Sequence, residues 1–150
     1  MRLVLDTNVL ISALLSSSGP PAEIIRRWEA EEFDVATSAE LIVELRRALN
    51  YPKVMKYLKL PSAALESWLK RFALIAVVVE PAEKIKVIRA DHADNRVLEC
   101  AIAAGAAFIV TGDEHLIALK EYKGVTITNP AGFIKWLAAH EGGGATANDS

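Results

Sequence analysis

The sequence predicts an α/β fold in which a mostly parallel sheet lies between two layers of helices. Short runs of apolar and β-branched residues alternate along the chain with longer segments that carry apolar residues at helical spacing. The short runs are almost continuously apolar, as expected for strands that are covered on both faces. Hydrophobic residues make up 52% of the 150 residues, which suits a single domain with a substantial core.

Five segments have the length and composition expected of these strands. They are residues 2–5, 33–36, 75–80, 107–111 and 125–128. The apolar residues after Asn8 are interpreted as an extension of the first strand, and SSSG at residues 16–19 as a flexible loop that follows it.

Helical segments separate the strands, which favours a doubly wound, five-stranded α/β/α sandwich. They span residues 21–30, 38–50, 62–72 and 94–104, with a short helix after Asp113 and a last helix from Asn129-Pro130 that stops before Gly142. Pro21 suits a first helical position. Either Ser38 or Thr37 with Glu40 can cap the second helix, and Gly105 is a typical residue at a helix end.

Residues 1–141 are expected to form one domain, and residues 142–150, which lack an apolar run, a flexible tail. The single cysteine, Cys100, excludes an internal disulfide framework and fits a reducing cytoplasm. No signal peptide is evident, and no apolar run approaches the roughly 20 residues of a membrane span. A cytoplasmic protein without membrane contact is therefore expected.

Four acidic residues stand where such a fold could bring them together. Asp6 and Asp113 each follow a predicted strand, Asp94 opens a helix, and Glu44 lies beside the apolar face of another helix. Ligands bind beyond the carboxyl ends of the strands in an open parallel sheet. Carboxylates gathered there repel one another, and a hard divalent cation removes that repulsion. Oxygen ligands without a cysteine or histidine cluster favour Mg²⁺ or Mn²⁺ over Zn²⁺.

Two of the four acids also have a plainer interpretation. Asp94 and Asp113 are both suited to capping the helices that they precede. Glu40, one turn before Glu44, is interpreted as part of an exposed acidic face. The histidines are scattered without metal-ligand spacing, and His115 is interpreted as an ordinary polar helix residue that could touch substrate. The conjunction of the four acids in one α/β chain favours metal binding.

Basic residues are concentrated in residues 46–71, where seven of them stand against Glu66 as the single acid. Such a patch attracts a phosphate backbone, and interleaved Tyr51 and Tyr57 could stack on unpaired bases. The candidates for nucleic-acid contacts are Arg46, Arg47, Lys53, Lys56 and Arg96. The alternative is a solvated helical hairpin whose aromatic residues face the core, as the spacing of Trp68 predicts for that residue.

The segments LVLDTNVLISAL, SAELIVEL and ADNRVLECAIAAGAAFIVTGD, with the spacing among them, resemble PIN-domain proteins. The resemblance covers Met1 to about Leu137 and is greatest to the VapC-like toxins of prokaryotic type II toxin–antitoxin pairs. It implies a parallel α/β/α sheet and Mg²⁺- or Mn²⁺-dependent cleavage of single-stranded RNA. It also implies a homodimer and an antitoxin that inserts into the active-site groove.

The resemblance further implies roles for individual residues. Carried over by position, the catalytic, metal-binding quartet would be Asp6, Glu44, Asp94 and Asp113. Asn8 would orient Asp6, and Thr111 would act similarly beside Asp113. Glu99 matches a frequently acidic position, but it lies roughly 140° around the helix from Asp94, so a supporting place is expected rather than direct ligation. Relatives often carry a further acid before the aspartate-asparagine pair; here Asp91 stands nearby, which bears on a second metal ion.

The leading hypothesis is a metal-dependent endoribonuclease, the toxin of a toxin–antitoxin pair. In it, Asp6, Asp94 and Asp113 bind the ion, and Glu44 ligates it or orients the attacking water. One alternative is a PIN-like module that binds RNA or a partner without cleavage. Another is a flavodoxin-like phosphoacceptor domain, which Thr7-Asn8 and Glu80-Pro81 fit poorly, because acidic residues would be needed at both places.

Overall fold

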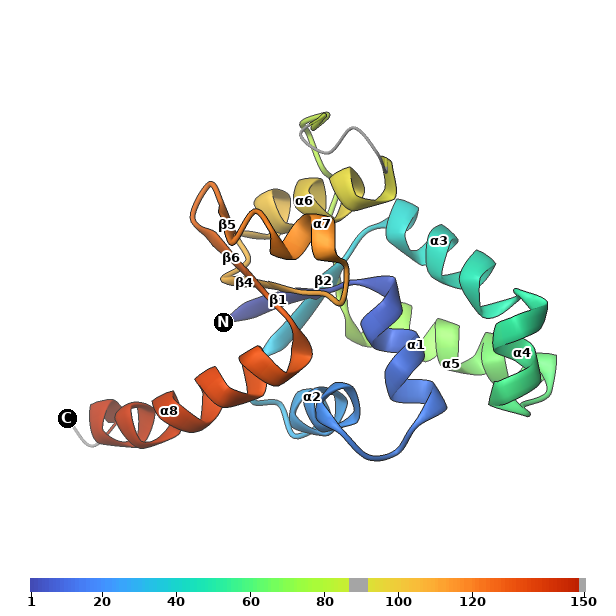
Figure 1. Cartoon of the computed structure of the whole chain (residues 1–150), viewed down its shortest axis with the longest axis horizontal. Coiled ribbons are helices and arrows are strands. Elements are labelled where there is room, and N and C mark those ends of the chain that lie inside the picture. Colours follow the sequence, from blue (N-terminus) through green and yellow to red (C-terminus); the bar gives the residue numbers. More distant parts are fainter. Residues whose placement is uncertain (87–91, 149–150) are drawn as a thin grey trace.

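The computed structural model describes residues 1–86 and 92–148, and within them the chain forms a six-stranded sheet with helices on both faces (Figure 1). The strands are β1 (Arg2–Leu5), β2 (Asp34–Thr37), β3 (Val77–Val78), β4 (Phe108–Val110), β5 (Glu121–Tyr122) and β6 (Val125–Thr128). Their order across the sheet is β3-β2-β1-β4-β6-β5. Within this described sheet all neighbours pair in parallel except β5 and β6. The predicted mostly parallel α/β sandwich is confirmed.

The helices alternate with these strands. They are α1 (Thr7–Leu15), α2 (Pro20–Glu29), α3 (Ala39–Leu49), α4 (Pro52–Leu58), α5 (Ser62–Ile75), α6 (His92–Ala104), α7 (Glu114–Ile117) and α8 (Pro130–Asn148). In the part of the chain that the structure describes, none of these helices is both long enough and apolar enough to cross a membrane.

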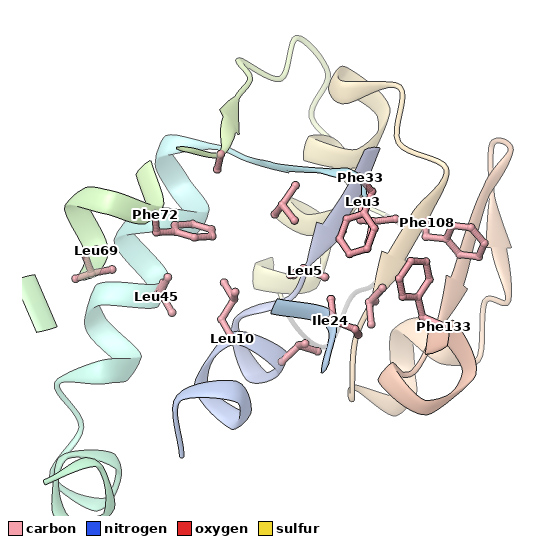
Figure 2. Packing of buried hydrophobic residues seen from close by; sticks show 14 of the residues in the cluster. Leu3, Leu5, Leu10, Ile24, Phe33, Leu45, Leu69, Phe72, Phe108 and Phe133 are labelled. Carbon is pink, nitrogen blue, oxygen red and sulfur yellow. The ribbon is translucent and has the colours of Figure 1, made fainter. Parts of the chain in front are cut away.

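Successive residues of β1 point to opposite faces of the sheet and so enter two separate cores. On one face, Leu3 and Leu5 belong to a core that includes Ile24 of α2 and Phe133 of α8 (Figure 2). On the other face, Val4 packs with buried residues of α6 and α7. The two cores hold β1 and β4 in parallel register, with Leu5 opposite Val110. The residues that follow these two strands therefore leave the sheet at the same edge.

Helix α1 was not predicted, and the expected strand extension over VLISALL is wrong. The chain turns into a helix immediately after Asp6, whose side chain caps the helix by accepting a hydrogen bond from the Thr7 amide. Val9 and Leu10 are buried on the face that this helix turns toward the sheet. Tertiary packing thus outweighs the modest helix propensity of the β-branched residues. Helix α4, also missed, begins at Pro52, which suits a first helical turn.

Two strand predictions also differ from the structure. β3 covers only two residues of the predicted segment 75–80, because α5 continues as far as Ile75. β5 was not predicted; it forms a tight hairpin with β6, in which Tyr122 pairs with Val125. The two residues between them, Lys123 and Gly124, have φ values of 47° and 85°, as a two-residue hairpin loop requires.

The last helix is longer than predicted. α8 runs to Asn148, so the expected helix end before Gly142 is wrong, and the backbone of residues 142–148 is helical. Adding a residue to an existing helix adds a hydrogen bond without a new nucleation step. A run of three glycines therefore weakens the helix without ending it.

Candidate metal site and adjoining groove

Asp6 leaves the carboxyl end of β1 and is 6% exposed. Its own amide donates to the Val110 carbonyl at 2.9 Å, which joins the end of β1 to the end of β4. The carboxylate accepts three hydrogen bonds, from the Thr7 amide at 2.8 Å, the Thr111 hydroxyl at 2.7 Å and the Asn8 amide group at 3.2 Å. Asn8 and Thr111 therefore fix the orientation of the Asp6 carboxylate. The resemblance implied a place for Thr111 beside Asp113, and the Thr111 hydroxyl contacts both aspartates.

The environment of Asp6 raises its pKa above the ordinary value, chiefly because burial penalises the charged form. The hydrogen bonds from Thr111, Thr7 and Asn8 act in the opposite direction, and the charge of Asp113 adds to the increase. Two carboxylates thus lie close enough at this edge to repel each other. A bound cation would relieve that repulsion.

The loop after β4 is tied to the loop after β1. The Asp113 amide donates to Thr111 Oγ1 at 2.9 Å, and the Gly112 amide donates to Asn8 Oδ1 at 3.0 Å. Asp113 Oδ1 also caps α7, accepting from the His115 amide at 2.7 Å. Asp113 is thus a helix cap whose carboxylate also faces the acidic edge.

Asp94, Asp113 and His115 can each offer one ligand atom such that all three atoms lie within 4.8 Å of one another. Asp94 lies in the first turn of α6 and is 4% exposed, whereas the His115 side chain is 66% exposed. Two carboxylates and an imidazole at this spacing fit a divalent cation. The sequence did not single out His115 as a ligand: Asp113 is only two residues away, but the approach of His115 to Asp94 depends on the packing of distant segments.

The remaining two members of the predicted quartet are Asp6, which follows β1, and Glu44, which lies on α3. Asp6 and Glu44 do not belong to the three-residue group found among residues 1–86 and 92–148. The Thr111 hydroxyl links Asp6 to Asp113, because it donates to the Asp6 carboxylate and accepts from the Asp113 amide. Glu44, which is half-buried, lines a groove of about 340 Å³ between α3 and α6. We call this the α3/α6 groove; its polar lining residues are Glu40, Glu44, Arg47, Tyr51 and Arg96.

Glu99 lies in the interior beside this groove and is 2% exposed. Its Oε2 atom accepts hydrogen bonds from the Ile85 amide at 2.8 Å and from Arg96 Nη2 at 2.6 Å. Arg96 Nη2 also lies 3.4 Å from the Ile85 carbonyl, and Arg96 Nε lies 3.8 Å from Glu40 Oε2. Glu99 thus joins α6 to the segment before it and contacts an arginine rather than the acidic edge.

The residues of the predicted basic patch lie in different environments. Arg46 pairs with Glu66 through two contacts of 3.2 Å, so part of its charge is neutralised within the chain. Arg47 lines the α3/α6 groove. Lys53 and Lys56 are exposed, as are the neighbouring Tyr51 and Tyr57. The sequence left open whether these tyrosines face the core, and the structure places them at the surface.

Trp68, expected in the core, is only partly buried. Its ring stacks on Phe72 at 5.5 Å between centroids, and both line an apolar groove of about 500 Å³ with Ile25, Trp28 and Ile75, here called the α2/α5 groove. Trp136 packs against Phe108 and Phe133. Asp91, considered for a second metal position, lies outside the described residues.

Fold and site together define a doubly wound α/β protein with a candidate divalent-metal site at the carboxyl edge of β1 and β4. The sequence model of the PIN domain matches residues 2–115, and the chain belongs to the PIN domain family. The uncharacterized protein MJ1680 of Methanocaldococcus jannaschii is 34% identical over 121 residues, which cover 81% of this chain and 76% of that protein.

Solved structures share the fold. VapBC2 from Rickettsia felis, bound to a DNA fragment from its promoter, matches with a TM-score of 0.58 and 17% identity over 86% of this chain and 98% of that chain. FitAcB from Neisseria gonorrhoeae matches with a TM-score of 0.52 and 22% identity over 85% and 97%. PAE2754 from Pyrobaculum aerophilum matches with a TM-score of 0.58 and 22% identity over 93% and 90%. The predicted resemblance to PIN-domain proteins is confirmed.

Proposed function

We propose that this protein is a metal-dependent endoribonuclease that cleaves single-stranded RNA. The observation that carries the proposal is the convergence of Asp94, Asp113 and His115 beside the buried Asp6. Membership of the PIN domain family supports a nuclease, and the exposed basic and aromatic residues of α4 support a single-stranded polyanion as substrate.

Asp94, Asp113 and His115 would hold the cation, with Asp6 as a further carboxylate at the same edge. When bound, a divalent cation promotes attack of water on a phosphodiester and offsets the charge that develops on the phosphate. Asn8 and Thr111 keep the Asp6 carboxylate turned toward this edge through their hydrogen bonds. Glu44 stands in the adjoining groove, where it would orient the attacking water or accept its proton. The imidazole of His115 favours Mn²⁺ over Mg²⁺, because Mg²⁺ prefers oxygen ligands.

The proposal is tested by incubating the purified chain with a labelled single-stranded RNA in Mg²⁺, in Mn²⁺ and in EDTA. We expect internal cleavage with either ion, at lower concentrations of Mn²⁺ than of Mg²⁺, and none in EDTA. The same sequence as single-stranded DNA is the matched control substrate. RNA binding without cleavage in every metal would overturn the enzyme proposal and favour a binding module.

We also propose that the chain forms a homodimer and is inhibited by a cognate antitoxin, as the resemblance to VapC-like toxins and the shared fold of VapBC2 suggest. Leu74, Ile75 and Val78 are 83%, 63% and 49% exposed at the end of α5 and along β3, which is an edge strand. Ile75 also lines the α2/α5 groove, so this apolar surface is continuous with it. A surface of this kind suits a second copy of the chain.

Replacement of Leu74 by glutamate is expected to convert the dimer to a monomer, because it places a charge in an apolar interface. Light scattering should give twice the chain mass of 16.3 kDa for the original protein and that mass for the variant. Leu60→Glu, at a site 43% exposed before α5, is the matched control and should remain dimeric. An original protein that is monomeric at all concentrations would contradict the dimer.

A further inference from the structure

We propose that the α3/α6 groove is a nucleotide subsite, in which Arg47 and Arg96 bind a phosphate of the RNA and buried Glu99 positions Arg96. This inference rests on the proposed function and names how its substrate is held. The groove volume of about 340 Å³ lies in the range of small-ligand sites. Its lining combines two arginines with Tyr51, which is 56% exposed and can stack on a base.

The anchoring of Arg96 is the main evidence for a built site. One nitrogen of its guanidinium, Nη2, is held by Glu99 Oε2 at 2.6 Å, and the Glu99 side chain is only 1% exposed. The second hydrogen bond to Glu99, from the Ile85 amide at 2.8 Å, fixes that carboxylate from another segment. Arg96 therefore enters the groove in a defined orientation, so that little conformational entropy is lost when it binds a ligand.

Arg96 also retains an unsatisfied donor. Among the described residues, no hydrogen-bond acceptor is found for the buried Arg96 Nε, and Glu40 Oε2 lies 3.8 Å away. An unsatisfied buried donor carries a cost that an anionic ligand can remove. The Arg96 side chain is 23% exposed, so part of the guanidinium is accessible from the groove. The planar guanidinium can donate two parallel hydrogen bonds to a phosphate, which an ammonium group cannot do.

The position of Arg96 on α6 assigns it to a neighbouring phosphate rather than to the phosphate that is cleaved. Arg96 follows Asp94 by two residues, and side chains two residues apart leave a helix on different sides. The rise between them is only about 3 Å along the helix axis. A strand with one phosphate at the acidic edge would thus place an adjacent nucleotide in the α3/α6 groove. Glu40 and Glu44 in the same lining would disfavour more than a single phosphate there.

The subsite is tested by RNA binding under conditions that prevent cleavage. The affinity of the full chain for a fluorescein-labelled ten-nucleotide RNA is measured by anisotropy in EDTA, between 50 and 200 mM salt. Arg47→Ala and Arg96→Lys are each expected to weaken binding roughly fivefold or more. Arg47→Ala should also reduce the salt slope by about one, whereas Arg96→Lys should leave the slope unchanged, because lysine keeps the positive charge. Tyr51→Ala should weaken binding while Tyr51→Phe retains it, because stacking needs only the ring. Lys135→Ala, an exposed basic residue of α8, is the matched control and should bind as the original chain does.

Glu99→Gln tests the positioning residue. It should weaken RNA binding about as much as Arg96→Lys, and the double variant should bind no more weakly than either single variant, because Glu99 acts through Arg96. Circular dichroism shows which variants are folded. If Glu99→Gln does not fold, Arg96→Lys still tests the subsite. Original affinity in Arg47→Ala and Arg96→Lys, or no RNA binding at 50 mM salt, would overturn the subsite. If RNA binding depends on these residues but no RNA is cleaved in Mn²⁺, the proposed nuclease activity is overturned and the proposed subsite is not.

Discussion

Replacement of Asp94 by asparagine is expected to slow RNA cleavage at least about a hundredfold, the loss that follows when a metal site is disrupted. Asparagine keeps the size of the side chain and removes its charge, so packing at this buried position changes little. Asp94 contributes one of the two carboxylates in the three-residue group with Asp113 and His115. Without it, the cation would lose much of the negative charge that binds it.

The same variant should lose metal binding measured without substrate. Mn²⁺ is expected to raise the melting temperature of the original chain, because an ion that binds only the folded state stabilises it, and to have little effect on Asp94→Asn. Asp34→Asn is the matched control, since Asp34 is an exposed aspartate at the start of β2, away from the carboxyl edge. Unchanged cleavage and unchanged Mn²⁺ stabilisation in Asp94→Asn would exclude Asp94 from the metal site.

The acidic edge could be predicted because part of its geometry is local in sequence. Asp6 comes directly after one buried apolar strand and Asp113 shortly after another, and parallel strands end at one edge of the sheet. His115 could not be identified as a candidate ligand in this way, because its approach to Asp94 depends on how α6 and α7 pack. The place of Glu44 in the α3/α6 groove likewise depends on how α3 sits beside α6, which helical periodicity does not encode.

Charge and periodicity also have limits within this chain. The count of basic residues includes Arg46, whose pairing with Glu66 joins α3 to α5 and cannot be read from composition. For Glu99, the helical angle from Asp94 argues against direct ligation, but it does not name a partner. The partner backbone at Ile85 lies 14 residues earlier, in a segment without regular structure. Such long-range contacts are set by the tertiary fold.

Replacement of Glu99 by leucine is expected to lower the free energy of unfolding by about 3 kcal/mol, the scale for removing one partner of a buried ion pair. Glu99 is 2% exposed and satisfies two donors, the Ile85 amide and Arg96 Nη2. Leucine would leave both donors without their acceptor. Because the Arg96 side chain is 23% exposed, water can reach part of the guanidinium, which places the loss at the lower end of that scale. Urea denaturation at neutral pH measures it.

The double variant Arg96→Met with Glu99→Leu should recover part of this stability, because it removes the stranded charge together with its partner. Glu66→Leu is the matched control: Glu66 also pairs with an arginine, but both side chains are nearly half exposed, so a loss within about 0.5 kcal/mol is expected. Equal losses from Glu99→Leu and Glu66→Leu would show that the buried pair does not stabilise the fold. Recovery of stability without recovery of RNA binding in the double variant would separate the structural contribution of Glu99 from its positioning of Arg96.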